Sequence, residues 1–181
     1  MLHLKNITAG NPKTAEQYQM TKQHGITWLF SEDDKNWYEE LKNFASDTIK
    51  MVYTGDGRVV WVGKDVTGIE PRNASVIEVP DITANRRITV PGYWFYRDDK
   101  FVFDYKLKAE DERDALLQRV SIMTSEWEKD LLLGLISDED REKLKAYRIY
   151  AKSLQAMDFS TIADKTSYNA IEWPVSPEAS S

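Results

Sequence analysis

Few residues in this chain have the type and spacing that catalysis or metal binding requires. The two histidines, His3 and His24, lie in an expected ragged start and at the end of a predicted helix, so we expect surface residues rather than a catalytic or metal-binding pair. The chain has no cysteine, which excludes disulfides, thiol catalysis and Cys-ligated metals. None of Ser31, Ser46 and Ser137 lies in a Gly-x-Ser-x-Gly nucleophile elbow.

The acidic runs Asp33–Asp34, Asp98–Asp99 and Asp138–Asp140 could in principle share a metal or act as an acid and a base. Adjacent carboxylates on a turn usually point apart into water, however, and none of these runs fits a calcium loop. The segment Gly55–Gly57 lacks the Lys-Ser/Thr of a phosphate loop and is typical of a hairpin turn. We therefore expect a protein that is not an enzyme, with no catalytic residue, no metal site and no cofactor.

The composition excludes further classes of protein. A net charge of −6 without a dense Lys/Arg run argues against a nucleic-acid partner. No apolar run approaches the ~18 residues that span a bilayer, and the first residues lack a signal-peptide pattern. Hydrophobic residues make up 41% of the chain, enough for packed cores. We expect a cytoplasmic protein without membrane insertion, which could leave the cell as part of a larger particle.

The elements that position these side chains begin with a short helix. Thr14 followed three residues later by Gln17 is a helix-capping pattern, so we expect a helix over Ala15–His24 that ends at Gly25. A short strand over Ile26–Phe30 follows.

Two structures are possible for the next segment. Trp28 and Trp37 could face each other across a hairpin, because the residues between them are turn-like. Alternatively, Trp37, Leu41 and Phe44 have the spacing of one helix face. We favour the helix.

Two β-hairpins are predicted further along. Thr48–Tyr53 and Arg58–Val62 are β-branched and aromatic runs joined by a turn with two glycines, and Val76–Val79 is another short strand. The aromatic runs Tyr93–Tyr96 and Phe101–Tyr105 form the second hairpin.

From Ala109 onward, apolar residues recur at helical spacing. They form two stripes, Leu116, Val120, Met123, Trp127 and Leu131, then Leu144, Tyr147, Ala151 and Leu154. Gly134 and the acidic cap at Ser137 separate the stripes, which predicts an antiparallel helical hairpin.

These elements predict an α+β fold. We expect a small α+β N-terminal domain over residues 1–80, a linker over 81–91 and a C-terminal domain over 92–181. The C-terminal domain would contain the second β-hairpin and the antiparallel helical hairpin.

Aromatic side chains are the strongest remaining functional signal. The chain has six tryptophans and nine tyrosines, and small domains have too little interior to bury them all. Aromatics left at a surface are typical anchors of protein interfaces or sugar sites. For Trp37, Trp61 and Trp94, buried and exposed positions are about equally supported. The predicted partner-binding residues are Trp28, Phe30, Trp37, Tyr38, Tyr53, Trp61, Tyr93 and Trp94.

The order of several short motifs resembles the tail fibre assembly proteins of tailed phages. These motifs are Leu4–Thr14, Trp28–Tyr38, Val79–Arg87, Gly92–Trp94, the helix around Tyr147, and Trp173–Pro174. The resemblance covers most of the chain. It carries no catalytic template.

The resemblance implies a chaperone that binds the C-terminal tip of a phage tail fibre and promotes its folding, trimerisation and assembly. Such a protein would act in the host cytoplasm and could stay on the virion at the fibre tip. The resemblance further implies that the N-terminal part chooses the fibre. Two alternatives stay open: an adhesin-like accessory that binds host-surface lipopolysaccharide or another glycan, and a regulatory interaction module without a chaperone role.

Overall fold

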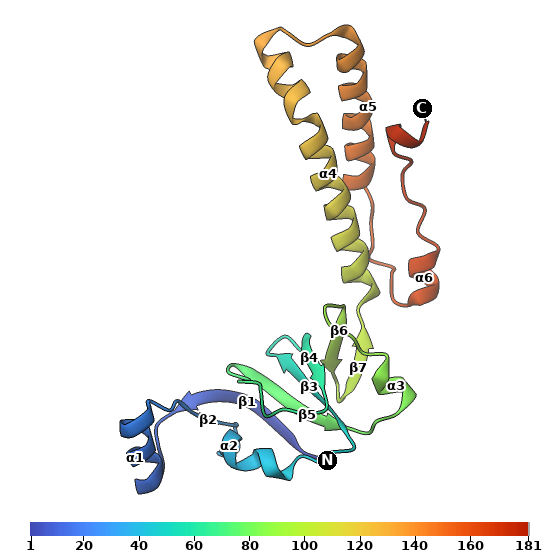
Figure 1. The fold of residues 1–181 in the computed structure, drawn as a ribbon. Coiled ribbons are helices and arrows are strands. Elements are labelled where there is room, and N and C mark those ends of the chain that lie inside the picture. Colours follow the sequence, from blue (N-terminus) through green and yellow to red (C-terminus); the bar gives the residue numbers. More distant parts are fainter. Residues whose placement is uncertain (181) are drawn as a thin grey trace. The chain divides into compact units, whose positions relative to one another are not determined.

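The computed structural model describes residues 1–180 of the chain. It divides the chain into two compact units, Met1–Phe103 and Asp104–Ser181, each of which is described by itself (Figure 1). Helices and antiparallel sheets are both present, which confirms the expected α+β class.

The first unit is built on a five-stranded antiparallel sheet with the strand order β2-β1-β5-β3-β4 (Figure 1). Its strands are β1 (His3–Gly10), β2 (Trp28–Phe30), β3 (Ile49–Thr54), β4 (Val59–Gly63) and β5 (Ala74–Val79). The expectation of a ragged start around His3 is therefore wrong, because the first residues pair with two neighbouring strands. The predicted hairpin of β3 and β4 is confirmed.

The first helix, α1 (Ala15–His24), has the predicted boundaries. The hydroxyl of Thr14 accepts a hydrogen bond from the N–H of Gln17 at 3.1 Å, and Gly25 ends the helix. The side chain of Gln17 accepts in turn from the N–H of Lys13 at 2.7 Å, one residue earlier than a standard capping box would place it.

The segment after β2 combines features of both expected structures. Phe30 forms an isolated antiparallel bridge with Asn36, so a hairpin-like turn does close here. The helix α2 (Trp37–Glu40) then begins, capped by the Asn36 side chain, and continues as the 3₁₀ helix η1 (Leu41–Asn43). The favoured helix is present but is broken into two short pieces.

Each face of the sheet has its own core, because side chains alternate along β3 and β5. The first face holds the buried residues Leu4, Ile7, Leu29, Trp37, Val52, Val66, Ala74 and Val76. The second face holds Ile49, Met51, Tyr53, Val59, Val79 and Ile88.

A buried charged network lies at one end of the sheet. Glu78 is paired with Lys50 across β5 and β3, and both side chains are buried. The Glu78 carboxylate accepts from the N–H of Leu2 at 2.9 Å and from the N–H of Ala45 and the hydroxyl of Thr48 at 2.7 Å each. Lys50 donates to the carbonyls of Ala45 and Thr48. The network therefore ties the chain start and the loop before β3 to the sheet.

The second hairpin, β6 (Trp94–Arg97) and β7 (Lys100–Phe103), packs on the second face of this sheet. The N–H of Tyr96 donates to the carbonyl of Gly57 in the first hairpin at 2.7 Å. Gly57 has a φ of 89°, and a Cβ there would lie 2.5 Å from the carbonyl oxygen of Tyr96. Only glycine lets the two hairpins approach this closely.

This arrangement differs from the expected domain division. The second hairpin belongs to the first unit rather than to the helices, and the segment expected as a linker folds onto the second face. That segment contains α3 (Thr83–Arg86) and the buried Ile88. The physical reason is that the apolar second face of the sheet needs a cover, which the aromatic hairpin and Ile88 supply.

The second unit contains the predicted helical hairpin, formed by α4 (Tyr105–Leu133) and α5 (Asp138–Gln155) (Figure 1). The helix α4 begins earlier than expected, because the Asp104 side chain caps it by accepting from the N–H of Leu107 at 2.9 Å. The helix α6 (Lys165–Asn169) and the 3₁₀ helix η2 (Pro177–Ser180) follow. Within residues 1–180, no helix combines the length and apolar character needed to cross a membrane.

The helical hairpin has its own core, which both predicted stripes enter. The buried residues are Val120, Tyr147, Tyr150, Ala151 and Leu154, with Leu116, Leu117, Met123, Trp127, Met157 and Trp173 partly buried against them. Leu131, the last residue of the first stripe, is exposed instead.

We predict that Glu78→Gln will destabilise the protein by about 1–3 kcal/mol, because the amide cannot accept all the hydrogen bonds that the carboxylate accepts. Burial alone would raise the pKa of Glu78, but the N–H of Leu2, the Thr48 hydroxyl, the N–H of Ala45 and the charge of Lys50 together lower it below its ordinary value of 4.5. The carboxylate therefore stabilises the fold above about pH 4.5, and this stabilisation is lost as the pH falls through the lowered pKa. Urea unfolding at several pH values should show that the free energy of unfolding falls less steeply with decreasing pH in the variant than in the wild type. An equal dependence of the free energy of unfolding on pH in both proteins would contradict the prediction.

We predict that Trp37→Ala will destabilise the protein by about 3–5 kcal/mol, because only 1% of Trp37 is exposed and its removal leaves a cavity in the first-face core. Trp61→Ala is the matched control, since Trp61 lies against the same core but is only partly buried. Thermal or urea unfolding should show the larger loss in Trp37→Ala. Equal losses would show that the two rings pack equally.

Candidate functional site

The structure separates the eight predicted partner-binding residues by exposure. Four are buried, namely Trp28, Phe30, Trp37 and Tyr53. The other four are exposed or partly buried, namely Tyr38, Trp61, Tyr93 and Trp94. The buried residues lie in the interior of the first unit and cannot serve as exposed anchors in this conformation.

The eight residues are also spread over the sheet. Trp37 and Trp61 pack on the first face, whereas Tyr53 and Trp94 pack on the second. The eight residues therefore do not form one continuous surface on the sheet. The physical reason is that neighbouring positions of a strand point to opposite faces.

Trp28 and Tyr38 form a separate pair near α1. Their ring centroids lie 5.8 Å apart in an edge-to-face arrangement. The indole N–H of Trp28 donates to the hydroxyl of Thr21 at 2.8 Å, and the hydroxyl of Tyr38 donates to the carbonyl of Thr27 at 2.9 Å. Of the pair, Tyr38 offers the accessible ring, with 39% of the residue exposed.

An aromatic group on the second face combines residues from both hairpins. Tyr96 lies 4.8 Å from Tyr53 and 5.0 Å from Phe101, measured between ring centroids. His3 adds a ring 5.5 Å from Tyr96, and its Nε2 is hydrogen-bonded to the hydroxyl of Tyr53 at 2.7 Å. Burial lowers the pKa of His3, with a further contribution from the charge of Lys5. His3 was missed as a site residue.

A pocket of about 440 Å³ opens beside this group, within the range of small-ligand and side-chain pockets. Its lining residues are Ile77, Val79, Ala84, Asn85, Arg87, Ile88, Trp94, Tyr96, Asp99, Lys100 and Phe101. We call it the aromatic pocket. Of the eight predicted residues, the aromatic pocket contains Trp94.

The aromatic pocket is lined by three charged side chains, Arg87, Asp99 and Lys100. The hydroxyl of Tyr96 donates to the Asp99 carboxylate at 3.2 Å. Burial, the hydrogen bond to Asp99 and its charge raise the pKa of Tyr96 to about 12, so this hydroxyl stays protonated. In contrast, the side chains of Arg87 and Lys100 have no ion pair among residues 1–180. The pocket therefore offers aromatic surface next to two positive charges, Arg87 and Lys100, and the negative charge of Asp99.

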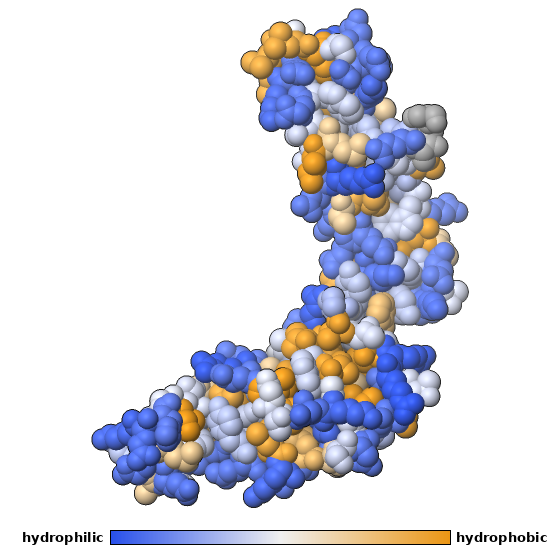
Figure 2. All heavy atoms as spheres, in the orientation of Figure 1, coloured by the Kyte–Doolittle hydropathy of each residue, from blue (hydrophilic) through white to orange (hydrophobic). Residues whose placement is uncertain are grey.

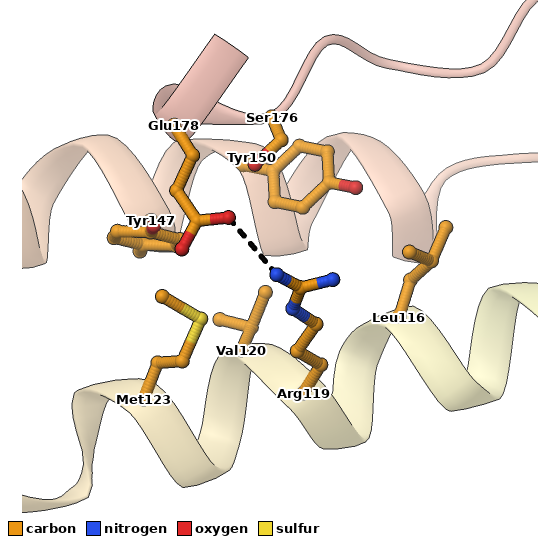
Figure 3. Close-up of a pocket in the computed structure, with 8 residues that line it drawn as sticks. All are labelled: Leu116, Arg119, Val120, Met123, Tyr147, Tyr150, Ser176 and Glu178. Carbon is orange, nitrogen blue, oxygen red and sulfur yellow. Dashed lines mark hydrogen bonds and ion pairs between the residues drawn. The ribbon is translucent and has the colours of Figure 1, made fainter. Parts of the chain in front are cut away.

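A second pocket, of about 300 Å³, lies in the second unit between the helical hairpin and the C-terminal segment (Figure 3). Arg119 from α4 reaches Glu178 across its mouth, and their guanidinium and carboxylate are 3.1 Å apart. Tyr147 lies beside the Glu178 carboxylate (Figure 3), and burial together with Glu178 raises the pKa of its hydroxyl. The ion pair and the tyrosine hold the C-terminal segment on the helices.

In the part of the chain that the structure describes, no group of three or more His, Asp or Glu side chains could hold a metal ion. What both pockets provide is aromatic and aliphatic surface with a few charges, which suits the binding of another polypeptide.

Comparison with known proteins gives a consistent result. The family model for the Caudovirales tail fibre assembly protein, lambda gpK, matches residues 39–178. Tail fiber assembly protein U' of Escherichia phage Mu is 49% identical over 168 residues, which cover 90% of this chain and 95% of that protein. The protein of the same name from Escherichia phage P1 is 48% identical over 168 residues, which cover 90% of this chain and 95% of that protein.

Tail fiber assembly protein U of Escherichia phage Mu is 39% identical over 184 aligned residues, which cover 98% of this chain and all of that protein. The matches span both units, and they agree with the resemblance carried by the short motifs. The chain therefore belongs to the tail fibre assembly protein family of tailed phages.

Proposed function

We propose that this protein is a chaperone that binds the C-terminal tip of a phage tail fibre, promotes its folding and trimerisation, and then remains on it. Family membership supports a role in tail fibre assembly. The aromatic pocket is the observation that supports direct binding, because it presents Trp94, Tyr96 and Phe101 beside the free charges of Arg87 and Lys100. Aromatic residues and arginine are the side chains most enriched in protein interfaces.

The chemistry of the task explains why such a surface suffices. A fibre tip built from three β-rich chains exposes unpaired strand edges and apolar surface until the trimer forms, and both promote aggregation. A protein that covers this surface lowers the fraction of chains lost to aggregation. The complex would form in the host cytoplasm and could be carried onto the virion at the fibre tip.

We place the fibre-binding surface on the first unit, at the partly exposed aromatic residues rather than at the buried ones. The two candidate places are the aromatic pocket around Trp94 on the second face and Trp61 on the first face. Binding of host-surface lipopolysaccharide or another glycan stays an alternative for the same aromatics, and the geometry gives it no separate support.

The central test is co-expression with the C-terminal fragment of the tail fibre of the same phage. We expect the two proteins to co-purify at a fixed stoichiometry, measured by native mass spectrometry. We predict that Trp94→Ala will weaken the complex by about 2 kcal/mol or more, roughly 30-fold in Kd, because Trp94 lines the aromatic pocket.

Trp61→Ala is the control on the opposite face, and thermal unfolding of both variants separates lost binding from lost folding. A selective effect of Trp61→Ala would move the binding surface to the first face. Undiminished binding by both well-folded variants would refute the assignment to the first unit, and a fibre that trimerises equally well without the protein would refute the chaperone function.

We also propose that the protein works without catalysis, metal or nucleotide. We predict that fibre trimerisation in a purified system will be unchanged by EDTA and by removal of ATP, since binding energy alone protects the folding chains. Trimer yield on a non-denaturing gel is the measurement. A loss of yield that is restored by adding back metal or nucleotide would contradict this proposal.

A further inference from the structure

The turn between α4 and α5 exposes an unusual concentration of leucine side chains. Leu131, Leu132, Leu133 and Leu135 are exposed by 46%, 87%, 70% and 71%. Figure 2 shows the hydrophobic surface that gathers where the two helices meet at this turn. Single exposed apolar residues are common, but a contiguous group marks an interaction site more often than chance. We call these four residues the leucine turn.

The leucine turn is held in a defined shape. Gly134 adopts a left-handed conformation with a φ of 72°, and its N–H donates to the carbonyl of Leu131 at 3.2 Å. The N–H of Leu135 donates to the carbonyl of Asp130 at 2.8 Å. The next residue, Ile136, is buried, and Ser137 caps α5. The leucines are therefore presented by a capped helix end, so little backbone conformational entropy is lost when they bind.

The surroundings of the leucine turn are acidic. Residues 126–143 contain seven Asp or Glu and three Lys or Arg, a net charge of −4 in a chain of net charge −6. Lys129 and Lys143 are already paired with neighbouring carboxylates on their own helices. A complementary partner would therefore present basic residues around an apolar groove.

A second copy of the chain does not fit these features. Two leucine turns that meet would bring two acidic surfaces together, which opposes association. Four side chains are also far fewer than the roughly 20–30 residues that each partner contributes to a stable interface. The leucine turn suits an additional contact within a complex that is held elsewhere as well.

We propose that the leucine turn is a second contact with the tail fibre, where it inserts into an apolar groove rimmed by Lys or Arg of the fibre polypeptide. This proposal rests on the proposed function, in which the first unit supplies the other contact. Two linked contacts raise the overall affinity without either being strong, because the second binding step becomes intramolecular. The second unit is then part of the binding surface as well as a structural element.

The test compares matched double variants of the full-length protein. Leu132→Gln with Leu133→Gln replaces two of the four exposed leucines of the leucine turn. Glutamine keeps a helix propensity close to that of leucine. The control is Ile122→Gln with Ile149→Gln, two residues on the same helices that are exposed by 68% and 67%. We expect the leucine variant to bind the purified C-terminal fibre fragment at least about tenfold more weakly, and the control to bind like the wild type.

A charge variant tests the basic rim. Asp130→Lys reverses a charge at the end of α4, where a cation also suits the helix dipole, so the fold should persist. We expect Asp130→Lys to bind the fibre fragment several-fold more weakly than the wild type at low ionic strength. The difference in affinity should disappear near 1 M salt, where the Debye length is about 3 Å. Stronger binding by Asp130→Lys would overturn the proposal.

Three further outcomes are decisive. Equal binding by the wild type and the leucine variant overturns the inference and leaves the proposed function intact. A wild type that does not bind the fibre fragment refutes both. Concentration-dependent dimerisation of the free wild type in sedimentation experiments, abolished in the leucine variant, would show that the leucine turn binds a second copy instead.

Discussion

The first unit depends on one buried carboxylate. Glu78 lies in β5, and its oxygens accept hydrogen bonds from the chain start at Leu2 and from Ala45 and Thr48 in the loop that leads into β3. A buried charge is tolerated only when it is fully bonded, and the neighbouring Lys50 supplies the opposite charge. This arrangement fixes β1 at the chain start against β5. The position of His3 in the aromatic group follows from it.

The two faces of the sheet bury their aromatic residues to different extents. On the first face, Trp37 is enclosed by aliphatic side chains and the ring of Phe44, and it belongs to the core. On the second face, the sheet is covered by a hairpin in which Trp94, Tyr96 and Phe101 are only partly buried, so aromatic surface stays available at its edge. A chain with this many aromatic residues can therefore have a packed core and still expose aromatic surface. In the proposed function, the same residue type stabilises the first face and binds the tail fibre at the second.

The local elements could be predicted from the sequence where a capping or turn residue marks them, as for α1 after Thr14 and for the hairpin around Gly57. The strand β1 could not, because an irregularity between Leu4 and Ile7 breaks the alternation that identifies a strand. The aromatic pocket could not be predicted either, since it joins Ile77, Ile88 and Trp94 through tertiary packing alone. Spacing along the chain reports which face a residue occupies within one element. It does not report which element covers that face.

The close approach of the two hairpins at Gly57 makes the sheet and the second hairpin of this chain structurally dependent on each other. Residues 54–57 and the second hairpin share one backbone contact that no side chain could enter. A recombinant that joined two relatives between Pro80 and Pro91 would combine a sheet from one parent with a cover from the other, and the aromatic packing would be mismatched. A crossover after Phe103 would keep sheet and cover together. We therefore expect that the first unit can be exchanged between relatives only as a whole, with the recombination point at the start of α4.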